Sequence, residues 1–113
     1  MPMSLPSRAE LETVAVRAGI LALGHFRRAV AVRKADRTLV TEADREVEAM
    51  LVAELGALFP EAGILGEEGA TRPASGPYRL VFDPIDGTSV FISGLPTWCV
   101  CIGILREDRK SVV

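Results

Sequence analysis

The apolar pattern of this 113-residue chain changes its period near residue 62, and this change constrains the fold more than any other feature. Before that point, apolar residues recur at helical spacing in two stretches. Each stretch opens on a capping-box pattern, Ser7 with Glu10 and Thr41 with Asp44. Beyond it, short apolar runs separated by Gly and Pro are typical of strands. The order predicts two helices followed by a sheet, an α+β fold.

The two helical stretches differ in how much of their surface is apolar. The first has an apolar stripe formed by Leu11, Val14, Ala15, Ala18, Leu21 and Ala22. Val16, Ile20 and Leu23 widen that stripe, which predicts a helix buried on more than one side. The second, ended by Pro60, has a stripe formed by Val47, Met50, Leu51, Leu55 and Leu58. Its charged residues, Glu48 among them, are assigned to its other faces.

The remaining segments are assigned from their composition and period. We predict a loop or short turn over residues 32–40, an exposed loop over 69–77 and a turn over 83–88. A short apolar run covers 63–66. Strands are predicted over 78–82, ending at Asp83, and over 97–105. Both faces of this last strand carry apolar residues, which predicts a central place in the sheet. Trp98 is interpreted as a core or interface aromatic rather than a platform for a substrate.

Cysteines and net charge limit the classes of function. Cys99 and Cys101 point to the same side of a strand but are poorly spaced for a disulfide, so we interpret them as reduced core thiols rather than a metal or redox pair. His25 is interpreted as a partly buried or surface helix residue.

A net charge of −2 without blocks of like charge predicts no nucleic-acid groove and no membrane patch. With no apolar run long enough to span a bilayer and no signal-peptide pattern, a cytoplasmic location is expected.

Three acidic clusters carry the candidate chemistry, at residues 41–44, 66–69 and 83–88. In the third cluster, Asp83 and Asp86 flank Pro84, which restricts the backbone where a strand ends. Gly87 lets a ligand approach the backbone, and the amides after it would face a phosphate if a helix starts there. Carboxylates on a rigid turn supply the oxygen ligands that hard cations such as Mg²⁺ prefer.

Each cluster also has a plainer structural interpretation. Thr41 and Asp44 have a capping-box-like arrangement, so a helix cap would account for Asp44 by itself, although one residue can fill both roles. Glu67 and Glu68 would ordinarily be solvated loop acids, and the 83–88 segment a connection from a strand to a turn. If these interpretations all held, the chain would be an ordinary α+β domain whose acidic residues are surface charges.

The segment Asp83-Pro84-Ile85-Asp86-Gly87-Thr88, followed by Phe91, Gly94 and Pro96, resembles the first signature of the inositol monophosphatase family. Two further segments are similar to earlier motifs of that family and come in the same order: Lys34 with residues 40–44, and Phe59-Pro60 with residues 66–68. Taken alone, Lys34 would be a surface charge. The similarity covers most of residues 33–106. It implies two N-terminal helices packed on a mostly antiparallel sheet, the first part of the layered αβαβα fold of inositol monophosphatases and sugar phosphatases.

The resemblance implies a site with up to three Mg²⁺ ions. By this resemblance Glu67 and Asp83 would bind the first metal together with the backbone carbonyl of Ile85. Asp83 and Asp86 would bind the second metal. Glu68 would be a neighbouring acidic residue rather than a principal ligand.

The same resemblance implies the reaction. Gly87 and Thr88 would present backbone amides to the phosphate, while Asp44 and Thr88 would orient and deprotonate the attacking water. The implied function is Mg²⁺-dependent hydrolysis of a small phosphate monoester by a metal-activated water. Inositol phosphate is the first expected substrate and histidinol phosphate the second, because residues 89–98 look like the histidinol-phosphatase branch. Nucleotide and sugar bisphosphates occur as substrates in the same superfamily.

The later half of the family carries a second signature with a further metal-binding aspartate, and no such segment follows Leu105. We therefore expect residues 1–113 to be the N-terminal, metal-binding part of the domain without its C-terminal half. The sheet edge and the first helix would then have uncovered faces. The alternative function is a truncated, catalytically silent metal-binding fragment, and association into a homodimer is the route by which a short chain would complete its site.

Overall fold

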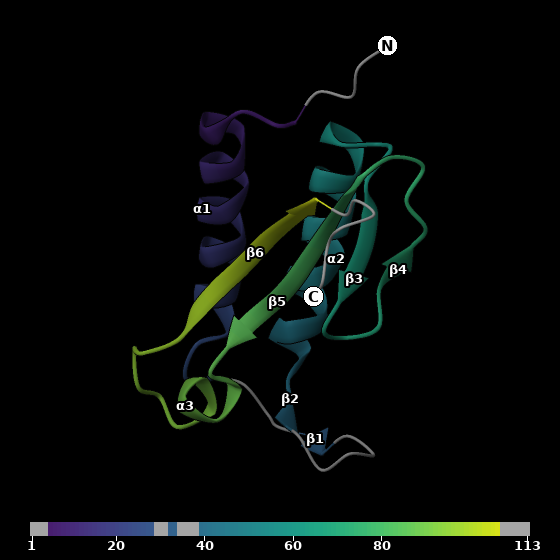
Figure 1. Ribbon diagram of the computed structural model, residues 1–113. Coiled ribbons are helices and arrows are strands. Elements are labelled where there is room, and N and C mark those ends of the chain that lie inside the picture. Colours follow the sequence, from purple (N-terminus) through teal and green to yellow (C-terminus); the bar gives the residue numbers. More distant parts are fainter. Residues whose placement is uncertain (1–4, 29–31, 34–38, 107–113) are drawn as a thin grey trace.

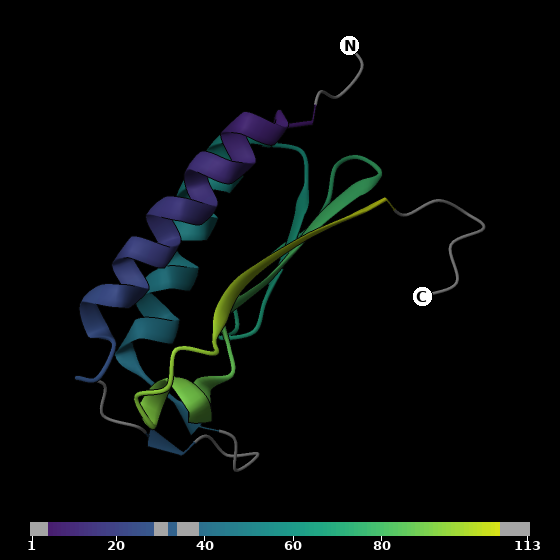
Figure 2. The ribbon, with the colours of Figure 1, turned by 90° about the vertical axis from the view of Figure 1, so that its left-hand side faces the viewer.

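The computed structural model describes residues 5–28, 32–33 and 39–106, so Lys34 and the middle of the predicted 32–40 loop lie outside the described residues (Figure 1). Its elements are α1 (Arg8–His25), β1 (Val32–Arg33), β2 (Leu39–Val40), α2 (Glu42–Leu58), β3 (Gly63–Gly66), β4 (Thr71–Arg72), β5 (Tyr78–Asp86), α3 (Thr88–Ile92) and β6 (Cys99–Arg106). Helices α1 and α2 form a layer on one face of a sheet, which Figure 2 shows nearly edge-on. This arrangement confirms the predicted α+β class.

Both predicted capping boxes are present and explain where the long helices begin. The Ser7 hydroxyl accepts from the Glu10 amide at 3.1 Å, and the Glu10 carboxylate accepts from the Ser7 amide at 2.8 Å. Thr41 and Asp44 make the same reciprocal pair at the start of α2. Each box satisfies backbone donors that a helix N-terminus otherwise leaves without partners.

The burial of the two helices departs from the prediction in two places. Val16, Ile20 and Leu23 are 60%, 62% and 58% exposed, so the expected burial of α1 on a second side is wrong within the described structure. The reason is that α2 and the sheet cover one side of α1 only, the side of its buried Val14 and Ala18. The other departure is Glu48, which is buried on α2 rather than lying on a polar face.

The main sheet has the strand order β4-β3-β5-β6. Strands β3 and β5 are parallel and the other two pairs are antiparallel, which confirms a mostly antiparallel sheet. Within the described residues β6 lies at an edge, so its predicted central place is wrong. Apolar residues on both faces show that a strand is suited to burial, but the neighbouring strand must also exist to bury it.

Three loop boundaries also differ from the prediction. The 32–40 segment contains β1 and β2, which pair as a small hairpin with Val32 opposite Val40. The predicted 69–77 loop contains β4. Strand β5 continues past Asp83 to Asp86, because a bulge lets the strand keep its pairing with β6.

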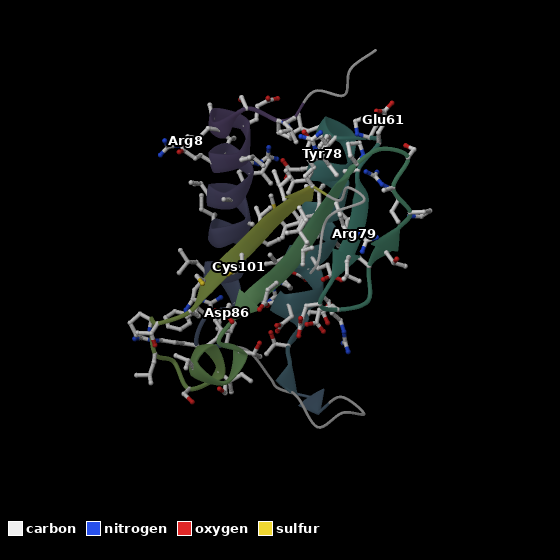
Figure 3. The ribbon with its side chains drawn as sticks, viewed as in Figure 1. Arg8, Glu61, Tyr78, Arg79, Asp86 and Cys101 are labelled. Carbon is white, nitrogen blue, oxygen red and sulfur yellow. The ribbon has the colours of Figure 1, made fainter. Side chains whose placement is uncertain are left out.

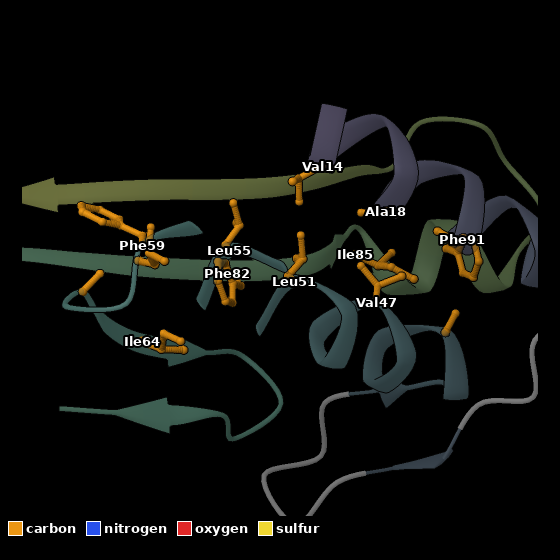
Figure 4. Packing of buried hydrophobic residues seen from close by; sticks show 14 residues of the cluster. Val14, Ala18, Val47, Leu51, Leu55, Phe59, Ile64, Phe82, Ile85 and Phe91 are labelled. Atoms are coloured by element: carbon orange, nitrogen blue, oxygen red, sulfur yellow. The ribbon is translucent and has the colours of Figure 1, made fainter. Parts of the chain in front are cut away.

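The core fills the space between the helices and the sheet (Figure 4). Val47, Leu51 and Leu55 of α2 are fully buried and face Phe82 and Ile85 of β5 in this cluster. Beside it, Trp98 packs edge-on against Phe91 with ring centroids 4.9 Å apart, which confirms its interpretation as a packing aromatic. These contacts hold α3 against the end of the sheet, where the acidic residues lie.

Arg72 attaches β4 to the end of α2. Its guanidinium donates to the carbonyl oxygens of Gly56, Phe59 and Ala62 at 2.8–3.2 Å. The last carbonyls of a helix lack partners within it, so a cation placed there satisfies them and interacts favourably with the helix dipole. No helix in the described ranges combines the length and the apolarity needed to cross a membrane.

Candidate active site

Four chain segments meet at one end of the sheet: the starts of α2 and α3, the end of β5 and the turn after β3. Figure 3 shows side-chain oxygens gathered at this end of the molecule, around the C-terminal ends of β3 and β5. Strands β3 and β5 run in parallel with Gly66 opposite Phe82, so the next residue along each chain, Glu67 after Gly66 and Asp83 after Phe82, lies beside the other. This parallel pair is the reason that Glu67 lies near Asp83.

Asp44 and Thr88 are joined although 44 residues separate them in the chain. Thr88 Oγ1 donates to Asp44 Oδ1 at 3.0 Å and also lies 3.2 Å from the Ile85 carbonyl oxygen. The other carboxylate oxygen of Asp44 accepts from the amide and the hydroxyl of Thr41 at 2.8 and 2.6 Å. Asp44 is only 1% exposed, so its carboxylate is held in one orientation by the cap and by Thr88. Asp44 therefore caps α2 and contacts Thr88 of α3 at the same time.

A β-bulge sets the direction of the two aspartates of β5. Asp83 pairs with Cys101 and Asp86 pairs with Cys99, so residues 84 and 85 oppose the single residue Val100. Without the bulge, residues three apart on a strand would point to opposite faces. With it, Asp83 and Asp86 share one face while Ile85 points into the core.

The surroundings of Asp83 disfavour its charged form. Burial, the charges of Glu67, Asp86 and Asp44, and a hydrogen bond to Asp86 together raise its pKa from 3.8 to about 6, and burial contributes most. The structure therefore brings the predicted acids close enough to repel one another. A concentration of carboxylates of this kind is favourable only when a cation or a proton offsets the charge.

Gly87 provides the turn from β5 into α3. It adopts the left-handed conformation, with φ of 93°, as N-cap of that short helix. The sequence left open whether a helix starts after Gly87; the structure has one there, and no side chain caps it. The first turn of α3 thus begins directly after the acidic end of β5.

Glu48 is a site residue that sequence reasoning missed. Glu48 is only 4% exposed. Its carboxylate accepts hydrogen bonds from the amides of Glu68 and Ala70 at 2.9 and 3.0 Å, and so fixes the turn that carries Glu67. Gly66 makes room for it, because a Cβ there would overlap the Glu48 carboxylate. The available signal was its spacing: Glu48 lies one turn after Asp44 on the same face of α2.

Other predicted residues lie elsewhere or have other surroundings. His25 at the end of α1 is part-buried and pairs with Glu46 of α2, which confirms its interpretation as a partly buried or surface helix residue. Cys99 and Cys101 are exposed, so their interpretation as core thiols is wrong for the described structure. They project from the face of β6 opposite to the one that packs on the core.

The family model described as the inositol monophosphatase family matches residues 6–113. The chain belongs to the inositol monophosphatase family. A histidinol-phosphatase from Chlorobaculum parvum is 43% identical over 101 residues, which cover 88% of this chain and 39% of that protein. An inositol-1-monophosphatase from Synechocystis is 40% identical over 75 residues, covering 66% of this chain and 26% of that protein.

A solved structure agrees with the fold of this inositol monophosphatase family member. An IMPase from Thermotoga maritima superposes with a TM-score of 0.78 at 32% identity, covering 88% of this chain and 40% of that one. The helices on a mixed sheet are therefore those of the family fold, as the resemblance implied. Against these three proteins, the chain spans 26–40% of the relatives' own length.

Proposed function

We propose that this chain provides the metal- and phosphate-binding part of a phosphatase site that hydrolyses a small phosphate monoester. The observation that carries the proposal is the link from Asp44 through Thr88 to the Ile85 carbonyl, beside an Asp83 whose pKa is raised by burial and by the neighbouring acids. Surface charges of an ordinary domain repel one another and spread out. Here a buried cap, a bulge and a parallel strand pair hold them together.

Mg²⁺ is the proposed cofactor, and the donor set fits it. The groups at the end of β5 are carboxylates and a carbonyl, the hard oxygen ligands that Mg²⁺ prefers. Glu67, Asp83 and the Ile85 carbonyl would hold one ion, while Asp83 and Asp86 would hold a second. When bound, Mg²⁺ neutralises phosphate charge and lowers the pKa of a coordinated water.

The chain's own residues then position the reactants. Thr88 Oγ1, held 3.0 Å from Asp44, is suited to orient a water and pass its proton to that carboxylate. The Thr41 contacts keep the Asp44 carboxylate turned toward Thr88, so that little reorganisation is required. The amides of Gly87 and Thr88, at the uncapped start of α3, would bind the phosphate oxygens.

Two phosphate monoesters are the proposed substrates, inositol phosphate and histidinol phosphate. Similarity to an inositol-1-monophosphatase supports the first, and similarity to a histidinol-phosphatase over 88% of the chain supports the second. Both present the same phosphate group to the residues described above. The alcohol groups would distinguish them, and the resemblance assigns most contacts to the alcohol to the later half of the family domain.

A second candidate function is metal binding without turnover by this chain alone. The chain's coverage of 39% of its histidinol-phosphatase relative favours testing it. We would measure phosphate release by the 113-residue chain with Mg²⁺ from both substrates, and Mg²⁺ binding by calorimetry. Release that Asp83→Asn abolishes would support the phosphatase, and Mg²⁺ binding lost in Asp83→Asn without release would support the second candidate. If Asp83→Asn changes neither, both proposals are wrong.

A matched pair of variants tests the role of Thr88. Thr88→Ser keeps the hydroxyl and is expected to retain most of the activity, whereas Thr88→Val keeps the shape and removes the proton path. For removal of such a proton-transfer group we expect a loss of about 10²–10⁴-fold in kcat. Equal activity of the two variants would exclude Thr88 from the reaction.

A further inference from the structure

Two thiols lie beside Asp86 that the proposed reaction does not use. Cys99 Sγ is 3.6 Å from Cys101 Sγ and 3.9 Å from Asp86 Oδ2. One ligand atom from each of these three residues lies within 4.8 Å of the other two. Among the side chains that the structure describes, no other three His, Cys, Asp or Glu residues come this close together. Figure 3 shows Cys101 and Asp86 close together at one end of the β5–β6 pair.

The backbone brings this group together. The bulge in β5 places Asp86 opposite Cys99, and alternation along β6 places Cys101 on the same face. All three side chains are exposed, on the side of β6 away from the core. The cysteines therefore fill no place in the packing of the described residues that would account for their position.

The spacing agrees with tetrahedral coordination of a thiophilic cation. Zn²⁺ with Zn–S bonds of about 2.3 Å holds two sulfurs about 3.8 Å apart, and a sulfur and a carboxylate oxygen about 3.6 Å apart. The observed 3.6 Å between sulfurs and 3.9 Å between sulfur and oxygen differ from these values by a few tenths of an ångström. Small rotations of exposed side chains are enough to close such differences.

The donor types separate this group from the oxygen-only ligands of the proposed Mg²⁺ positions. Thiolates favour Zn²⁺ and other soft or borderline cations, while Mg²⁺ binds oxygen and keeps its waters. Two sulfurs and one oxygen leave a fourth tetrahedral position, which faces solvent here and can be taken by water.

We propose that Asp86, Cys99 and Cys101 form a binding site for a thiophilic divalent cation such as Zn²⁺. Each thiol releases its proton to solvent when the metal–sulfur bond forms. Binding itself rests on the geometry of these three residues. Only its consequence rests on the proposed function: a Zn²⁺ ion that takes Asp86 competes with Mg²⁺ for a shared ligand.

The test uses Co²⁺ as a spectroscopic stand-in for Zn²⁺, with the 113-residue chain kept reduced by a phosphine. We expect thiolate-to-cobalt absorption that saturates at one equivalent per chain and disappears when Zn²⁺ is added. The Cys99→Ser/Cys101→Ser double variant should lose this absorption. Its absence in the unaltered chain, or its persistence in the double variant, would overturn the proposal.

Two further variants separate this inference from the proposed function. Thr97→Ser, an exposed change two residues before Cys99, should keep the absorption, and its loss there would overturn a site built from the thiols. Asp83→Asn is expected to lose the Mg²⁺ response and keep the Co²⁺ absorption, because Asp83 is outside the three-residue group. If Mg²⁺ has no effect on any variant while the cysteine-dependent absorption is present, the proposed function fails and the thiophilic site stands.

Discussion

At the scale of single residues, Asp83 is where burial and like charge act together. Its pKa is about 6 in the folded chain and 3.8 in the reference state. Between these values the folded chain keeps a proton that the unfolded chain has released. The free energy of unfolding therefore falls as pH rises through this window and stays low above it.

We expect the metal-free chain to lose thermal stability as pH rises from 4 to 7, with most of the Asp83 contribution lost by about pH 6. Asp83→Asn removes the titrating group, so it should flatten this dependence and raise Tm at pH 7. The measurement is Tm against pH in the presence of a chelator. Glu61→Gln, an exposed acid in a loop, is the control. If Tm of Asp83→Asn falls equally steeply with pH, the repulsion between Asp83 and its neighbouring acids does not contribute to the stability of the fold.

Glu48 is the residue through which the site depends on the interior of α2. In Glu48→Gln, one of the two carboxylate acceptors becomes an NH₂ group facing an amide N–H of the turn after β3. We expect a stability loss of about 1–3 kcal/mol, the usual consequence of a buried donor without an acceptor. Urea denaturation measures it, with Glu42→Gln at the exposed start of the same helix as the matched control. A change equal to the control's would mean that Glu48 does not hold the turn.

At the scale of elements, the pairing of β3 with β5 and the bulge in β5 do most to assemble the site. The parallel pair places Glu67 beside Asp83, and the bulge turns Asp83 and Asp86 to one face. The helix starts then add Asp44 and Thr88 from a third and a fourth segment. Three carboxylate-bearing segments and the hydroxyl of a fourth come together because each backbone position is held by packing away from the charges.

The attachment of β4 to α2 gives a prediction at this scale. Arg72→Ala leaves three carbonyl oxygens near the end of α2 without their cationic donor. We expect a loss of about 1.5–3 kcal/mol in the free energy of unfolding, as for hydrogen bonds to charged groups. Arg8→Ala removes an exposed ion pair with Glu12 and should change stability by less than about 1 kcal/mol. The measurement is the denaturant midpoint of each variant, compared at unchanged slope. Equal losses of stability in Arg72→Ala and Arg8→Ala would contradict the capping role of Arg72.

At the scale of the whole molecule, the outer side of α1 carries the largest exposed apolar side chains of that helix. Val16, Ile20 and Leu23 lie on it, each more than half exposed. Apolar side chains gathered on one face favour association, because burying them removes apolar area from water.

We therefore predict that the 113-residue chain self-associates in a concentration-dependent way, with a homodimer as the first species. Ile20→Lys should weaken the association, while Leu95→Lys, an exposed apolar residue near α3, should change it little. Light scattering at several concentrations gives the mass. A mass that stays at one chain throughout, or an equal response to both variants, would exclude α1 as the surface involved.

The chain's own sequence determined the features that depend on neighbouring residues. Both capping boxes, the ends of α2 and the glycine turn into α3 were predictable, because caps and turns use hydrogen bonds over three or four residues. The ordered motifs also identified the family and named Asp44, Glu67, Asp83, Asp86 and Thr88 as a set. Their assignment as ligands and catalytic groups is still a proposal.

Only the tertiary structure decided features that depend on residues far apart in the chain. The bulge across from β6 decided that Asp83 and Asp86 share a face and that Asp86 meets two thiols. The turn after β3 decided that Glu48 is buried, since its partners lie 20 and 22 residues away. Apolar periodicity predicts which side of an element is suited to burial, but burial itself needs a neighbour. For β6, Val16 and the two cysteines, the described structure places solvent where the pattern predicted packing.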